Sequence, residues 1–353
     1  MLGDGLTPGS PTVQQLVHDG VRFTVTVAPA RPGWNLVRVD TAGVAGDHGH
    51  DREGTPEVRV GSAKTPPVPA TPRPGTGGLW ARVLLPPGIS TVEVSHGPEH
   101  RLPFPVSTGA AAATTRSAAG VNGPECAMTA VGAVLAGSGR PVEVCPADRL
   151  TVEDADTLRA AVRVLADRGA ERVVVVADGT ERGRAAEAVV SETAEHEGIA
   201  TAGGGATPGP TDALVVVAGW RTAARALDGT ATEQRRVALF NHGVWLAPWL
   251  LTPQLVDAVS GAVLPLRFDI RDDDARSYAA ALGRTLPGMS PSQAGYTGWV
   301  DARGEAAGEP VRLYAAARTA YMPAPAGHAA HETSVAWFPG GTVTPVSGEL
   351  ESP

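Results

Sequence analysis

Lysine is almost absent from this 353-residue sequence, in which Lys64 is the single example and arginine supplies the other positive charges. Acidic residues outnumber basic residues by 37 to 29, so the formal net charge is -8. Non-specific nucleic-acid binding depends on clustered Lys and Arg side chains. The charge balance therefore excludes a large phosphate-binding surface, and we expect no nucleic-acid partner.

Long apolar runs are also missing. No stretch of the sequence approaches the roughly 18 to 20 apolar residues that a membrane-spanning helix needs. Residues 1–11 lack the basic and apolar regions of a signal peptide. We therefore expect a soluble chain that carries no signal peptide as written.

Three short motifs of common enzymes do not occur. The turn after Asp178 lacks the G-x-G-x-x-G pattern of dinucleotide-binding folds, and the chain has no phosphate-binding G-x-x-x-x-G-K-[ST] loop. No G-x-S-x-G elbow is present to carry a nucleophilic serine. These absences favour a non-catalytic protein.

The sequence has two cysteines, Cys126 and Cys145. We expect a helix over residues 126–136 and a strand over residues 141–144, which would place both sulfurs at the same edge of one layer. That geometry favours a disulfide and an oxidising, extracytoplasmic compartment, where the protein is secreted or tethered outside the cell. The alternative is two buried free thiols.

An unbroken β-branched run at residues 172–176 is followed by a turn and by helix-forming sequence. Similar units follow at residues 213–218, 236–240 and 261–266. Alternation of buried strands and helices predicts a parallel α/β layer. We assign residues 120–347 to this α/β module.

The N-terminal part has a different pattern. Apolar and polar residues alternate over residues 12–107 with Pro and Gly clusters between them, which predicts a small antiparallel β-sandwich. Residues 108–119 are small and polar without a periodic pattern, and we interpret them as a linker. The predicted fold is therefore a multidomain β plus α/β protein.

Part of the β domain resembles a known family. Its opening hairpin resembles that of immunoglobulin-like domains associated with bacterial copper-resistance proteins, through Val27-Ala28-Pro29-Ala30-Arg31-Pro32-Gly33-Trp34-Asn35 and the alternating valines that follow.

Imidazole suits copper or zinc. We expect no cofactor, with copper as the alternative, held by His48, His50 and Asp51; the further histidines of this domain are His18, His96 and His100, and a weaker cluster is His328 with His331 and Glu332. A solvated loop is the favoured interpretation of residues 46–51.

Residues 173–299 resemble the second lobe of a type I periplasmic binding protein of the branched-chain amino-acid receptor kind. The residues that carry this resemblance are 174–179 with Gly183, then 212–219, then 261–263 and the later helices around Tyr278 and Tyr296. The family has two lobes of comparable size, whereas residues 120–170 are too few for a complete first lobe. The resemblance implies recognition of a small solute.

Polar and aromatic side chains follow the predicted strands, where open parallel sheets bind ligands. We expect them to hold a small polar molecule such as an amino acid, by stacking and by pairing with its carboxylate. A partner protein, such as a membrane-anchored relative, is a further expected ligand; metal handling by the β domain and an enzyme using the His242 region are the alternatives. These predicted ligand-binding residues are Asp178, Thr180, Trp220, Arg221, Asn241, His242, Trp245 and Arg267. Alternatively, the tryptophans fill the core and the charged residues cap helices.

Overall fold

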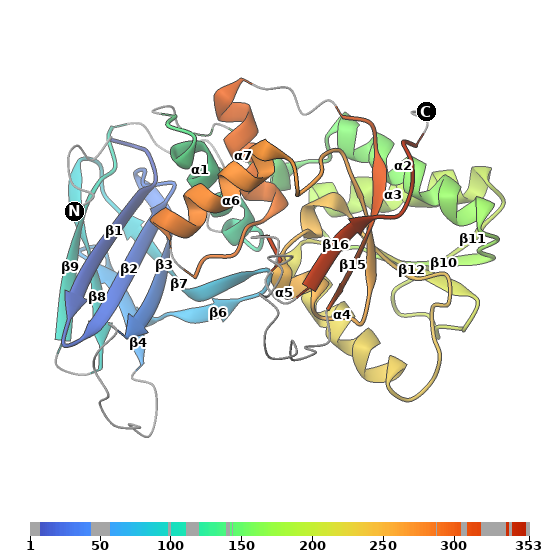
Figure 1. Ribbon diagram of the computed structural model, residues 1–353. Coiled ribbons are helices and arrows are strands. Elements are labelled where there is room, and N and C mark those ends of the chain that lie inside the picture. The colour runs from blue at the N-terminus through green and yellow to red at the C-terminus, as the bar shows by residue number, and fades with distance from the viewer. Residues whose placement is uncertain are drawn as a thin grey trace, which may run out of the picture.

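A computed structural model gives the arrangement of the chain (Figure 1). An all-β domain lies at one end, an α/β module lies at the other, and a group of helices lies between them. The structure describes residues 8–43, 57–97, 100–110, 120–138, 142, 144–286, 288–304, 309–318, 337–338 and 341–350.

The β domain consists of two antiparallel sheets that share one core. Alternating apolar residues such as Phe23, Val37, Val92 and Phe104 point between the sheets and are buried. The predicted antiparallel sandwich is confirmed, whereas its immunoglobulin-like identity stays a prediction. One sheet has the order β1 (Thr12–His18), β2 (Val21–Ala28), β3 (Gly33–Gly43), β7 (Thr76–Leu85) and β6 (Thr71–Arg73); the other has the order β5 (Thr65–Pro69), β4 (Val58–Ser62), β8 (Ile89–His96) and β9 (His100–Ser107).

The proline-rich residues 65–73 form the two edge strands β5 and β6, one in each sheet. Proline cannot donate to a sheet ladder, so it is accommodated at edges. After β6 the chain turns at Gly75, where the backbone has a φ of 80°. This β6–β7 hairpin extends to the α/β module, where a Cβ at Gly75 would lie 2.4 Å from the ring of Trp220.

The α/β module is built on one mixed sheet. In the described residues its strand order is β11-β10-β12-β13-β14-β15-β16, with parallel pairing from β11 to β14 and antiparallel pairing of β15 and β16. The strands are β10 (Arg172–Val176), β11 (Ala200–Gly203), β12 (Asp212–Val216), β13 (Val244–Leu246), β14 (Ala262–Leu266), β15 (Arg312–Arg318) and β16 (Gly341–Pro345).

Helices α2 (Val152–Asp167) and α3 (Glu181–His196) lie on one side of this sheet, and α4 (Trp220–Gln234) lies on the other (Figure 1). The hydroxyls of Thr151 and Thr180 accept hydrogen bonds from the first turns of α2 and α3. Gly169 and Gly198, both with a φ of 75°, end the same helices. A capping hydroxyl therefore begins each of these helices and a left-handed glycine follows its end.

Three helices fill the space between the sandwich and the sheet: α1 (Gly123–Leu135), α6 (Asp273–Thr285) and α7 (Gln293–Arg303). Ala127 of α1 is in a buried cluster with Trp80 of the β domain. Met128 and Val131 of α1 belong to the large core of the α/β module. The helical group therefore packs against both parts of the chain, while the predicted domain boundaries stay a prediction because residues 111–119 lie outside the described ranges.

The predicted strand at residues 236–240 is wrong. The chain forms a turn there, with Phe240 at a φ of 58° and Gly243 at 97°, and the strand β13 begins at Val244. Residues 142 and 144 of the predicted strand 141–144 are not in a strand either. The sequence also favours a strand over residues 334–338, but residues 337 and 338, the described part of that segment, are not in one. The sequence favours a strand over residues 311–316, which is confirmed as β15, and a Gly/Pro loop over residues 201–211, whose first three residues instead belong to the edge strand β11.

No helix in the described ranges is long and apolar enough to cross a membrane.

Candidate functional site

A cleft of about 480 Å³ opens at the carboxyl edge of the parallel strands. Its walls come from the turns after β13 and β14, the first turns of α2 and α3, the segment around Cys145, and α7. A cleft of this size is in the range of small-molecule sites. Its lining residues are Val144, Cys145, Pro146, Arg149, Thr151, Glu153, Asp154, Thr157, Arg182, Pro248, Trp249, Leu266, Arg267, Phe268, Gln293, Tyr296, Thr297, Val300 and Asp301.

Aromatic side chains form one side of the cleft. The Phe268 and Tyr296 rings lie 4.5 Å apart between centroids at a tilted angle. Trp249 is buried, and its Nε1 donates to the Ala218 carbonyl at 3.0 Å. These contacts hold the rings in place, so the wall offers a rigid apolar surface to a ligand.

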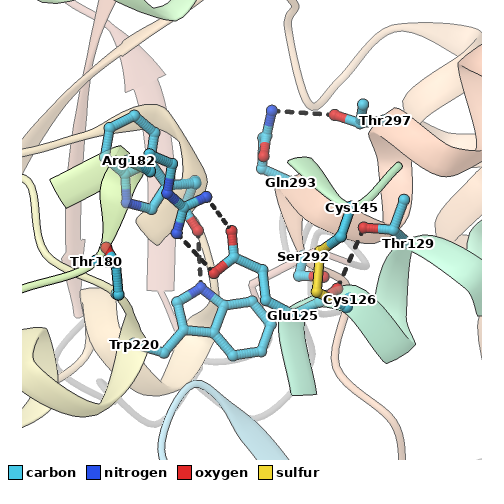
Figure 2. Close-up of polar contacts among 12 residues, drawn as sticks. Glu125, Cys126, Thr129, Cys145, Thr180, Arg182, Trp220, Ser292, Gln293 and Thr297 are labelled. Atoms are coloured by element: carbon cyan, nitrogen blue, oxygen red, sulfur yellow. Dashed lines mark hydrogen bonds and ion pairs between the residues drawn. A yellow bond between two sulfur atoms is a disulfide. The ribbon is translucent and has the colours of Figure 1, made fainter. Parts of the chain in front are cut away.

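A buried ion pair lies beside the cleft, between Glu125 of α1 and Arg182 of α3 (Figure 2). Both guanidinium Nη atoms donate to the carboxylate, at 2.5 and 2.9 Å, and the two side chains are 1% and 2% exposed. The Arg182 guanidinium also lies 4.5 Å from the centroid of the Trp249 ring. The pair therefore fixes the helical group onto the α/β module and orients the aromatic wall.

Asp154 is the acidic group most affected by burial. Its surroundings raise the pKa of the carboxyl to about 6, because desolvation disfavours the charged form and Glu125 and Glu153 add repulsion, while Arg182 and a hydrogen bond from Thr151 oppose the shift. Burial also raises the pKa of Asp301, which lines the same cleft from α7. A ligand cation between these carboxylates would favour their charged forms.

Arg267 supplies positive charge at the end of β14. Its Nε donates to the Thr157 hydroxyl at 3.1 Å and to the Glu153 carbonyl at 3.4 Å, and its Nη1 contacts the Glu309 carbonyl at 3.5 Å. These bonds hold the guanidinium at the cleft. Its Nη2 makes no hydrogen bond within the described part of the chain, so that donor is available to a ligand carboxylate.

The disulfide between Cys126 and Cys145 is confirmed, with a Cα–Cα distance of 5.3 Å and a sequence separation of 19 (Figure 2). It joins the first turn of α1 to the rim of the cleft. The disulfide was predicted from a strand over residues 141–144 that would end beside Cys145. That part of the argument was wrong, because Cys145 precedes the 3-10 turn Pro146–Asp148 instead of ending a strand. A loop of this length stabilises the fold by about 3 kcal/mol in the chain-entropy description.

Of the eight predicted ligand-binding residues, Arg267 lines this cleft. Asp178 joins two loops instead: its Oδ2 accepts from Gly219 N at 2.7 Å, and its Oδ1 accepts from Thr180 N at 3.1 Å. Trp220 is 4% exposed and its Nε1 donates to the Trp249 carbonyl at 2.8 Å (Figure 2). Trp220 and Arg221 line a separate cavity of about 10 Å³, which has room for a water molecule.

Asn241 and His242 lie at the opposite edge of the sheet. They precede β13, and Asn241 N donates to the Pro210 carbonyl just before β12 begins. Their predicted position after a strand was therefore wrong, because the strand begins at Val244. Trp245 lies within β13, is 2% exposed, and packs under α2 with its Nε1 donating to the His242 carbonyl.

The predicted metal ligands His48, His50 and Asp51, and the cluster of His328, His331 and Glu332, lie outside the described residues. Cys126, Cys145 and Asp148 place their ligand atoms close together, but both sulfurs are bonded to each other and cannot bind an ion.

A scan against protein-family models finds no match, and a search of the curated proteins finds none. Solved structures with partial similarity are solute-binding proteins of ABC transporters. One from Desulfitobacterium hafniense in complex with Leu is 14% identical over 42% of this chain and 47% of its own, with a TM-score of 0.30. One from Rhodopseudomonas palustris in complex with benzoate is 12% identical over 42% and 46%, with a TM-score of 0.32.

A third, from Rhodopseudomonas palustris BisB5 in complex with 3,4-dihydroxybenzoic acid, is 11% identical over 57% of this chain and 66% of its own, with a TM-score of 0.38. The chain spans about half the length of the first two of these proteins.

Proposed function

We propose that the α/β module is a non-catalytic, extracytoplasmic recognition domain whose cleft binds a small zwitterionic solute such as an amino acid. The observation that carries the proposal is the cleft itself, which combines a fixed arginine, a partly buried carboxyl and an aromatic wall at the carboxyl edge of a parallel sheet. The Cys126–Cys145 disulfide supports an oxidising compartment.

The two signs of charge in the cleft match the two ends of an amino acid. Arg267 presents an Nη2 donor that makes no hydrogen bond among the described residues, and Arg149 lies exposed at the same cleft. Asp154 is positioned for an ammonium group, while Phe268 and Tyr296 offer an apolar surface to a side chain. A ligand with both charges and an apolar side chain would therefore satisfy three features at once.

Recognition fits the cleft better than catalysis. The cysteine that lines it is in the disulfide, and no histidine is among its described lining residues. His242, the centre of the alternative enzyme hypothesis, lies at the opposite edge of the sheet. A partner protein that inserts a charged side chain into the cleft is the second candidate, because the same donors and acceptors would bind it.

Arg267→Gln is expected to weaken ligand binding about tenfold or more, because the ligand carboxylate loses a charge-assisted hydrogen bond. Isothermal titration with a panel of aliphatic and aromatic amino acids, together with the matching carboxylic acids and amines, measures this. Arg225→Gln is the matched control, since Arg225 is an exposed arginine on α4 away from the cleft. If no member of the panel binds the parent protein, the small-solute proposal fails.

Ligand affinity is expected to fall as the pH drops through about 6. Protonation of Asp154 removes the carboxylate that faces the ammonium, so affinity should decrease by about tenfold per pH unit below the pKa. Because this pKa is raised in the folded protein, the ligand-free protein should conversely lose stability as the pH rises through about 6.

Titrations between pH 5 and 7.5 measure the pH dependence, with Asp154→Asn as the comparison. The variant should bind weakly at every pH and show a flat profile. A parent profile without a change near pH 6 would show that Asp154 does not contact the ligand.

A further inference from the structure

Two histidines and an aspartate meet at one end of the β-sandwich, far from the cleft in the sequence and the fold. His18 ends β1, Asp19 lies in the following turn, and His100 begins β9. The Asp19 Oδ2 atom lies 3.4 Å from His18 Nε2 and 3.3 Å from His100 Nε2. The three potential ligand atoms all lie within 4.8 Å of one another.

The two distances to Asp19 Oδ2 match a coordination site better than a pair of hydrogen bonds. With Zn–N and Zn–O bonds of about 2.0 to 2.2 Å, neighbouring ligands of a tetrahedral zinc ion are about 3.3 to 3.6 Å apart. The two distances to Asp19 Oδ2 are within that range. Ordinary hydrogen bonds between these groups would be shorter, at about 2.7 to 3.2 Å.

The His18 Nε2 atom gives a second, independent indication. It is shielded from solvent, and within the described part of the chain it makes no hydrogen bond. A buried ring nitrogen without a partner is unfavourable unless something else binds it. It lies within 4.8 Å of the Asp19 and His100 ligand atoms.

We propose that His18, Asp19 and His100 form a binding site for a first-row divalent transition metal, with Zn²⁺ or Cu²⁺ as the ions that two imidazoles and one carboxylate select. The three side chains are 39%, 67% and 44% exposed, so the ion is accessible and keeps at least one position for water. These ligands are different residues from His48, His50 and Asp51, which lie outside the described ranges.

The position of the site gives the metal a structural consequence. β1 belongs to the five-stranded sheet and β9 belongs to the four-stranded sheet. The two strands already contact each other through Gln14, whose Nε2 donates to the Pro105 carbonyl. A bound ion would join the two sheets at this edge and raise the thermal stability of the β domain, since ligands that bind only the folded state stabilise it.

Metal titration of the full chain after chelator treatment tests the proposal, with Zn²⁺ and Cu²⁺ in separate calorimetric experiments. We expect binding with a stoichiometry that falls by one ion per chain in His18→Ala and in His100→Ala. Loss of an outer-shell partner already lowers metal affinity about 10- to 100-fold, so loss of a ligand should lower it by at least about 100-fold. The three positions lie at strand ends and are partly exposed, so the variants should fold.

His96→Ala is the matched control, because His96 pairs with His100 in the β8–β9 ladder but its ring packs against Phe23. This variant and the double variant His48→Ala with His50→Ala should both keep the site. The metal-dependent rise in melting temperature should likewise persist in these two and disappear in His18→Ala. Unchanged binding in both His18→Ala and His100→Ala, or no binding by the parent protein, would overturn the proposal.

Discussion

Replacing Glu125 by alanine is expected to reduce the free energy of unfolding by about 3 to 5 kcal/mol. Glu125 is 1% exposed and accepts both hydrogen bonds from Arg182, which is equally buried. The variant leaves a guanidinium charge inside the protein without its carboxylate. Because stable domains unfold with about 5 to 15 kcal/mol, this loss is a large fraction of the total.

Urea unfolding followed by tryptophan fluorescence measures the effect, since Trp249 lies against the Arg182 guanidinium. The double variant Glu125→Leu with Arg182→Leu removes both charges and should be markedly more stable than Glu125→Ala. That order follows because the penalty comes from one uncompensated charge and not from loss of the pair. A Glu125→Ala midpoint equal to that of the parent would contradict the assignment of a buried pair.

The strands β10, β12 and β14 could be predicted from the sequence because each is a continuous apolar run between clear turn signals. The failure at β13 has a local cause. Residues 236–240 contain four consecutive apolar residues, Val237, Ala238, Leu239 and Phe240. The observed strand Val244–Leu246 is also a short apolar run. Hydrophobic periodicity cannot show which of two such short runs forms the strand. The turn between them, which includes Gly243, places the strand in the second run.

The cleft could not be predicted because its parts are distant in the sequence. Asp154 belongs to the start of α2, Phe268 follows β14, and Tyr296 lies on α7. Two local signals were present: the Thr151–Asp154 cap that begins α2, and Arg182 in an otherwise ordinary first turn of α3. Neither signal reveals what lies opposite, which depends on how α7 packs against α1.

The three-helix group is built from residues at both ends of the α/β module. Within the described ranges, α1 comes from the start of the module, whereas α6 and α7 come from residues near its end. The group therefore consists of one helix that precedes the parallel strands in the sequence and two that follow them. The disulfide and the Glu125–Arg182 pair attach it to the rest of the α/β module. Because α7 lines the cleft, the packing of these helices against one another determines the shape of the cleft.

Glycines permit the closest contact in this group. A Cβ on Gly132 of α1 would lie 1.8 Å from the carbonyl oxygen of Gly295 on α7, and a Cβ on Gly298 would lie 2.0 Å from the carbonyl oxygen of Thr129. The two helices thus touch backbone to backbone at both positions. Backbone atoms within helices cannot move aside as a flexible side chain can, so a methyl group there must separate the helices.

Gly132→Ala is therefore expected to lower the free energy of unfolding by about 3 kcal/mol or more, at the upper end of the range for overpacked sites. Gly283→Ala on α6 is the matched control: this exposed helical glycine has no atom within 4 Å of an added Cβ. The control should be more stable than the parent by about 0.5 to 1 kcal/mol, because alanine restricts the unfolded chain and favours helix. Denaturant unfolding of both variants measures the difference, and equal midpoints would show that α1 and α7 do not pack at Gly132. Since α7 lines the cleft, Gly132→Ala should also lower the affinity for any solute that binds the parent protein, whereas Gly283→Ala should leave that affinity unchanged.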